Sequence, residues 1–202
     1  MRSLHGAASC FYQLEQFEEA LAITKDMLVL NEGDNQGARY IHVSALIALK
    51  KFAEAKRFLD KHKYDETAHM LYSRALVLFY VSKDKKVAEI AFAKAGACNL
   101  YIPALVLSPK LVPGGDLPDS YAIGSFEEAI LYCVDSQDFW YENVELFKWF
   151  KCMCSMHMLA TASGLEALKQ EEIERERRER TRGKGGNSDN ILDLNFFLNK
   201  ND

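Results

Sequence analysis

The sequence predicts an all-α protein, a solenoid of three helical hairpins plus a degenerate fourth, followed by a C-terminal charged helix. The first observation is where proline falls: all four prolines of the 202-residue chain lie between Pro103 and Pro118. Proline interrupts helices and central strands alike, so the long proline-free blocks on either side, rich in Ala, Leu, Glu and Lys, are typical of helices. The second observation is an internal repeat of about 34 residues in the first hundred.

The repeat is visible in three short motifs: Phe17-Glu18-Glu19-Ala20, Phe52-Ala53-Glu54-Ala55 and Lys85-Lys86-Val87-Ala88. Their alanines are 35 and 33 residues apart. A unit of this length is too long for one helix and contains no proline, so we expect two antiparallel helices per unit, the second beginning near each motif. Residues 1–100 are therefore predicted to form three helical hairpins.

Small and aromatic residues recur at fixed places within these units. We expect Ala20, Ala55 and Ala88 at helix crossings, where a larger side chain would push the helices apart. Gaps between neighbouring hairpins would be filled by Phe11, Phe79 and Phe92. The pattern resembles the tetratricopeptide repeat (TPR), which implies a TPR-like α-solenoid, with Glu15 where that repeat usually has a turn glycine. The alternative is a non-repeating helical bundle in which the alanines coincide by chance.

The proline stretch begins a second module. Residues 101–124 hold every proline and the pair Gly114-Gly115, so we expect a Pro/Gly-rich extended segment with at most a short turn at Ala104–Leu107. Ser125 then offers a helix N-cap, with Glu128 as its capping-box partner. Because Phe126-Glu127-Glu128-Ala129 repeats the motif at Phe17, residues 125–168 are predicted to form a degenerate helical hairpin whose first helix is replaced by the proline segment.

This module carries a more specific resemblance. Its features are Ile102-Pro103 after the last regular repeat, Leu117-Pro118 before Tyr121, Gly124-Ser125 before the Glu-Ala pair, and the tryptophans Trp140 and Trp149. With these features, residues 70–150 resemble the C-terminal region of bacterial TPR proteins and of the suppressor-of-tumorigenicity-seven family. The resemblance implies an architecture and carries no catalytic activity.

The end of the chain divides into two parts. In residues 169–182 glutamates precede arginines by four positions, as in Glu171 and Arg175, which stabilises an exposed charged helix. Residues 183–202 read as a linker and an apolar tail motif, Ile191–Leu198. We expect the tail either to dock back onto the repeats or to be presented to another protein.

The sequence offers few candidate metal ligands or catalytic residues. Cys152, Cys154 and His157 form the one cluster of metal-ligand types, but residues two apart on a helix point about 200° from each other, so we expect buried cysteines and no metal. No nucleophile motif or phosphate-binding glycine loop is present. We therefore expect no cofactor and no enzymatic activity.

A solenoid of this kind has a concave surface lined by the first helix of each hairpin. The predicted partner-binding residues are Tyr12, Tyr40, Ser44, Ile47, Ser73, Arg74, Val77 and Tyr80, and His5 and Ser9 are also expected to face inward. Several TPR cochaperones hold the C-terminal carboxylate of a chaperone with lysines and asparagines. At the matching places this chain has mostly other residues, among them His5, Ser9 and Ile41, so we expect no such clamp. Tyrosines and aliphatics suit an extended or helical peptide.

The leading hypothesis is a non-catalytic interaction scaffold or adaptor that binds a partner peptide or helix in this groove. One alternative is an RNA- or ribosome-associated factor that uses the basic end of the charged helix, although a net charge of -4 argues against a nucleic-acid binder. Another is an accessory domain of a larger protein, since the repeat is already in phase at Met1. Five scattered cysteines and no long apolar run predict a reducing compartment, the cytoplasm or the nucleus, and no membrane span.

Overall fold

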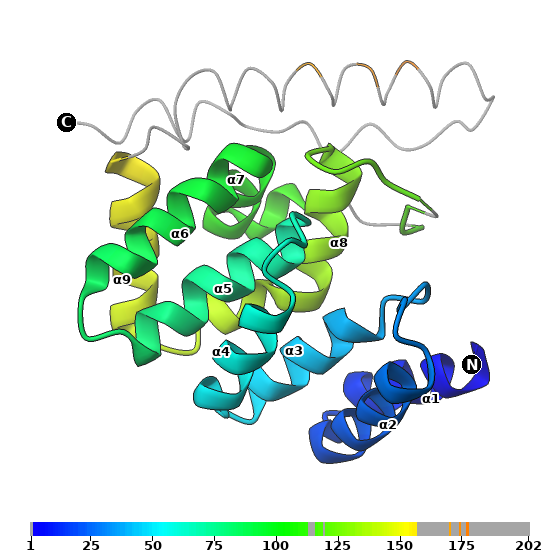
Figure 1. Ribbon diagram of the computed structural model, residues 1–202. Helices are drawn as coiled ribbons and strands as arrows, with labels where there is room; N and C mark the ends of the chain where they lie inside the picture. Colours follow the sequence, from blue (N-terminus) through cyan, green and yellow to red (C-terminus); the bar gives the residue numbers. More distant parts are fainter. Residues whose placement is uncertain are drawn as a thin grey trace.

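The computed structural model describes residues 2–112, 116–118 and 120–156, together with the helical residues Gln170, Glu174 and Arg177. Within these residues every regular element is a helix (Figure 1), so the all-α prediction is confirmed for this part of the chain. The rest of the charged helix predicted for 169–182, the linker at 183–202 and the tail Ile191–Leu198 lie outside the described residues.

The first six helices form three consecutive pairs. They are α1 (Arg2–Gln13) with α2 (Phe17–Leu30), α3 (Ala38–Ala48) with α4 (Phe52–Lys61), and α5 (Ala68–Val81) with α6 (Lys85–Cys98). The second helix of each pair begins at Phe17, Phe52 or Lys85, the residue that opens each repeat motif. Helix α2 packs on both α1 and α3, and α4 packs on both α3 and α5, so neighbouring pairs stack in chain order. The pair α1–α2 lies at one end of the molecule (Figure 1).

The segment predicted to be extended begins instead with a helix. It contains α7 (Tyr101–Leu107) and a short 3₁₀ helix, η1 (Pro109–Leu111), before α8 (Phe126–Ser136). Pro103 is the third residue of α7, where a backbone N–H has no partner inside the helix, so its missing donor costs nothing there. Because α7 packs on α8, the first helix of this pair is shortened and not replaced. The 3₁₀ helix η2 (Gln137–Trp140) and α9 (Val144–Met156) follow.

Alanines at the predicted helix crossings are fully buried. Ala20, Ala55 and Ala88 are 0% exposed, as is Ala129 of the related motif in α8. Phe92 is also 0% exposed, and its ring meets those of Tyr72, Trp140 and Phe150 edge to face. Phe79 is partly buried and packs against this core. The apolar core cluster extends from Val43 to Cys154, and Leu21 is the one residue of the first two helices that packs against it.

A buried carboxylate joins α5, α6 and α8. Glu128 is 4% exposed, and its two oxygens accept hydrogen bonds from the backbone N–H groups of Ala68 (2.8 Å) and Gly124 (2.7 Å) and from the side-chain amide of Asn99 (3.0 Å). Ser125 caps α8 as predicted, because its hydroxyl accepts from the Glu128 N–H at 3.1 Å. The predicted return bond of a capping box is not made, since the Glu128 side chain reaches Gly124 and the Ser125 N–H donates to the Ala122 carbonyl.

Position 124, in the turn before α8, requires glycine. Its φ of +81° lies in the left-handed region, and a Cβ built on it would stand 2.8 Å from the Cys98 carbonyl oxygen. In contrast, the turn between α1 and α2 has Glu15 at a φ of 58°, the conformation that the usual glycine of that turn would adopt without a steric cost.

Phe92→Ala is expected to lower the free energy of unfolding by roughly 3–5 kcal/mol, because it removes a fully buried aromatic ring and leaves a cavity. Urea denaturation measures the loss. Ile90→Ala in the same helix is the control, since Ile90 is 71% exposed. Equal losses in the two variants would contradict the packing described above.

Glu128→Gln is expected to lower the free energy of unfolding by about 1–3 kcal/mol, because an amide nitrogen replaces one acceptor oxygen and faces a buried donor. The matched control is Glu127→Gln, the same chemical change one residue earlier in the first turn of α8. Urea denaturation of both variants decides the matter, and a smaller effect for Glu128→Gln than for Glu127→Gln would refute the role assigned to this carboxylate.

Candidate functional site

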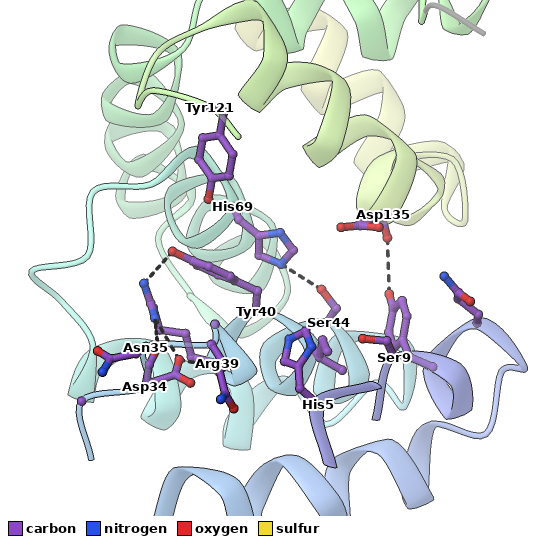
Figure 2. Close-up of a pocket in the computed structure, with 16 residues that line it drawn as sticks. His5, Ser9, Asp34, Asn35, Arg39, Tyr40, Ser44, His69, Tyr121 and Asp135 are labelled. Atoms are coloured by element: carbon purple, nitrogen blue, oxygen red, sulfur yellow. Dashed lines mark hydrogen bonds and ion pairs between the residues drawn. The ribbon is translucent and has the colours of Figure 1, made fainter. Parts of the chain in front are cut away.

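A cavity of about 630 Å³ lies among the helices and is called the central pocket below (Figure 2). Its walls come from α1, α3, the start of α5, α8 and two connecting segments, 33–37 and the one that holds Tyr121. The lining residues are His5, Ser9, Tyr12, Gln13, Gly33, Asp34, Asn35, Gln36, Gly37, Arg39, Tyr40, Ile41, Ser44, His69, Tyr121 and Asp135. Residues more than one hundred positions apart thus share one cavity.

An ion-pair network holds one wall. The Asp34 carboxylate accepts hydrogen bonds from the backbone N–H groups of Ala38 (2.8 Å) and Arg39 (3.0 Å). These two N–H groups lie at the start of α3 and have no partner within the helix. Arg39 donates to Asp34 at 2.8 Å and to Asp65 at 2.5 Å, and its guanidinium lies 4.3 Å above the Tyr40 ring. These bonds join the second hairpin to the segment before α5.

The charges in this network are mutually satisfied. Burial alone would lower the pKa of Arg39, but its hydrogen bonds to Asp34 and Asp65 outweigh that effect and raise it. Burial likewise opposes ionisation of Asp65, yet bonds from Thr67 and Arg39 hold its pKa below the usual value. The guanidinium is therefore committed to two carboxylates, and the three groups together carry a net negative charge.

The centre of the pocket is formed by Tyr40, Ser44 and His69. Tyr40 and Ser44 are four residues apart on α3 and so face the same side of that helix. His69 of α5 lies 2.9 Å from the Ser44 hydroxyl through Nε2, and its ring centroid is 5.2 Å from that of Tyr40. Burial lowers the pKa of His69 to about 4, so the imidazole is neutral at physiological pH.

The wall opposite is made by α1 and α8. The Tyr12 hydroxyl of α1 donates to the backbone carbonyl of Asp135 in α8 at 3.4 Å. The Asp135 carboxylate itself has no hydrogen bond or ion pair within residues 2–112, 116–118 and 120–156. Although the side chain reaches solvent, the surrounding walls remove enough water to raise the pKa of Asp135 to about 6.

Tyr121 completes the rim. It comes from the segment between α7 and α8, is 42% exposed, and lies above Tyr40 and His69 in Figure 2. Burial of its hydroxyl and the neighbouring Tyr40 hydroxyl raise the pKa of Tyr121 to about 12. Three tyrosines, Tyr12, Tyr40 and Tyr121, therefore surround a pocket of moderate size.

Some of the residues predicted to bind a partner do meet here. Tyr12, Tyr40 and Ser44 line the pocket, together with His5 and Ser9, which were also expected to face inward. Ile47, Ser73 and Val77 do not line the pocket and are 3%, 3% and 0% exposed, so the structure does not place them on an open inner surface. Helix α5 is packed against α3, α4, α6 and α8, which leaves almost none of its surface open.

Arg74 and Tyr80 are committed to contacts with the second hairpin. Arg74 donates to the Asp60 carboxylate at 2.9 Å and to the Leu59 carbonyl, both on α4. Tyr80 stacks on Phe52 with ring centroids 4.0 Å apart and planes 8° from parallel. Both side chains therefore hold α5 against α4 and lie away from the central pocket.

Sequence reasoning did not find Asp34, Arg39, His69, Tyr121 and Asp135. A local signal existed for Asp34, an N-cap residue type just before the apolar run of α3. His69 is a single polar residue near the start of the mainly apolar helix α5, and no motif around it indicates a binding site. Tyr121 and Asp135 lie far from the first hairpin in the sequence, and only the packing of α8 brings them to α1 and α3.

The next features are the possible metal ligands and the cysteine thiols. Among the described residues, no three His, Cys, Asp or Glu side chains are placed to hold a metal ion. Burial raises the pKa of the Cys154 thiol to about 12, so the thiol stays protonated. His157 of the predicted cluster lies outside the described residues.

No single helix in the described part is both long enough and apolar enough to cross a membrane. Helices α6 and α7 together have the required length and apolar character, but a bend of 107° separates them.

Searches of this chain against protein-family models, curated proteins and solved structures found no match. The site is therefore interpreted from its own geometry.

The neutral His69 makes folding dependent on pH. Its pKa is 6.5 when unfolded and about 4 when folded, so between these values the unfolded chain binds more protons and stability falls as pH falls. The slope from this residue is at most about 1.4 kcal/mol per pH unit. We expect His69→Gln to flatten the dependence of the free energy of unfolding on pH between 6.5 and 5, measured by urea denaturation.

His42 contributes in the same direction, because burial also lowers its pKa to about 4, so the slope in His69→Gln is reduced and not abolished. A second variant, His42→Gln, and the double variant separate the two contributions. An unchanged slope in His69→Gln would show that this imidazole is solvated in the folded protein.

Proposed function

We propose that this protein is a non-catalytic, TPR-like scaffold that binds a segment of a partner protein in the central pocket. The observation that carries the proposal is the pocket itself, about 630 Å³ in volume, with three tyrosines and with walls from four helices of the array. Peptide recognition in such a concavity uses aromatic faces for contact area and hydroxyl and backbone groups for hydrogen bonds.

Three features support a TPR-like solenoid. The helices pair in chain order, the repeat motifs open the second helix of each pair, and the repeated alanines are fully buried. In such an array each hairpin buries its apolar face against its neighbours, and curvature creates a concave surface. Helix α8 lies across this surface and converts an open groove into a pocket that is bounded at one side.

The character of the walls supports binding of a peptide segment. Arg39, Asp34 and Asp65 are bonded to one another and fix the wall in place, so little of their conformational freedom remains to be lost on binding. Tyr12 and Tyr40 stand on rigid helices, and tyrosine has few rotatable bonds to immobilise. The alternative that uses the basic C-terminal helix depends on residues outside the described part, and no observation favours it.

Peptide display tests this proposal. The 202-residue chain is immobilised and used to select from a library of random phage-displayed peptides, and each selected peptide is then measured against Tyr121→Ala by fluorescence polarisation. Tyr121 lines the rim from a connecting segment, so removing its ring changes the pocket with little effect on the fold. We expect affinity to fall about tenfold, as for loss of an aromatic anchor.

Tyr64→Ala is the matched control. It removes the same side chain from a position that is 85% exposed and outside the pocket, and it should leave the affinity unchanged. Selected peptides that bind Tyr121→Ala and Tyr64→Ala equally well would overturn the proposed site, and so would a selection that yields no specific peptide.

A further inference from the structure

We infer that the central pocket takes a basic side chain, lysine or arginine, of the bound segment, and that Asp135 is its counter-ion. The inference rests on the proposed function and names the chemistry of the partner residue at that site.

The charges that border the pocket leave a negative excess. Arg39 is the one Lys or Arg among its lining residues, and it is already bonded to the carboxylates of Asp34 and Asp65. Asp135 adds a further carboxylate on the opposite wall, and His69 is neutral. An anionic ligand would meet repulsion here, whereas a cation would supply the missing positive charge.

The groups left without partners on these walls are acceptors. Asp135 is exposed to solvent, and its carboxylate has neither a hydrogen bond nor an ion pair within the described part of the chain. The buried side-chain carbonyl oxygen of Gln36 has no donor there either. An ammonium or guanidinium group offers several N–H donors and a charge in one ligand, which a neutral or acidic side chain does not.

The aromatic side chains fit the same ligand. Tyr12, Tyr40 and Tyr121 surround the pocket, and a cation over a tyrosine face is attracted by the negative face of the ring. Tyr40 already makes this contact within the protein, because the Arg39 guanidinium lies 4.3 Å from its ring centroid and donates to its hydroxyl at 2.6 Å. The rings of Tyr12 and Tyr121 are therefore the ones proposed to meet the ligand. An aliphatic stem of lysine or arginine would pack against the rings, with its charged end at Asp135.

Two synthetic tripeptide amides test this inference: N-acetyl-Gly-Arg-Gly-amide and its neutral counterpart N-acetyl-Gly-Gln-Gly-amide. Each is titrated into the ¹⁵N-labelled 202-residue chain, and amide chemical shifts are followed. The arginine peptide is expected to shift the signals of Asp135, Ser9 and Tyr40 saturably, at a concentration at least about tenfold lower than the glutamine peptide requires. A third peptide, N-acetyl-Gly-Lys-Gly-amide, should behave like the arginine peptide.

Asp135→Asn is expected to remove this preference, because the variant keeps the side-chain shape and loses the charge. Its matched control is Asp26→Asn, the same charge change at an exposed position of α2 outside the pocket, which should preserve the preference. Equal binding of the arginine and glutamine peptides, a preference that survives in Asp135→Asn, or the same loss in Asp26→Asn would each overturn the inference, as would the absence of any shift at the pocket.

The display experiment separates this outcome from failure of the proposed function. If displayed peptides depend on Tyr121 but lack basic residues and bind Asp135→Asn normally, the pocket binds peptides and the inference is wrong. If no displayed peptide depends on Tyr121, the proposed function itself fails.

Discussion

A buried carboxylate needs hydrogen-bond donors, and the donors to Glu128 determine how the second half of the protein is assembled. Its oxygens are shared among the start of α5, the end of α6 and the turn before α8, three places far apart in the sequence. Any displacement of α8 would leave the charge or one of those donors unsatisfied in the interior. Asp135 lies two helical turns after Glu128 on the same helix, so the anchor that seats α8 also sets the far wall of the pocket.

The sequence predicted those parts of the fold that depend on local pattern. Ala20, Ala55 and Ala88 are buried where the repeat placed them, and Phe17, Phe52 and Lys85 each begin a helix, because period and residue size are local properties. The failures have two causes. Pro103 is tolerated for a local reason, because it falls in the first turn of α7, whereas Val77 is buried for a tertiary reason, because α5 is packed against α3, α4, α6 and α8. The pocket residues on α1 and α3 could be predicted because they follow the repeat pattern. Tyr121 and Asp135 could not, because only tertiary packing brings them to the pocket and no short-range pattern in the sequence indicates that packing.

Arg39 and Arg74 hold neighbouring parts of the protein together. Arg39 fastens the second hairpin to the segment before α5, and Arg74 fastens α5 to α4 through Asp60 and a backbone carbonyl. A fixed guanidinium whose hydrogen bonds are already made is a poor receptor for an anionic ligand. The central pocket instead presents tyrosine hydroxyls, a neutral imidazole and the Asp135 carboxylate.

The apolar core is not distributed evenly among the hairpins. The apolar cluster extends from Val43 to Cys154, and Leu21 is the one residue of α1 and α2 that packs against it. The first hairpin is joined to the remainder mainly through α3, so its amides are expected to exchange with solvent through openings that leave the remainder folded. Tyr12 belongs to this hairpin and Asp135 to the remainder. A bound segment that contacts both would hold the two parts together. Occupancy of the pocket would then slow the opening of the N-terminal hairpin, which comprises α1 (Arg2–Gln13) and α2 (Phe17–Leu30).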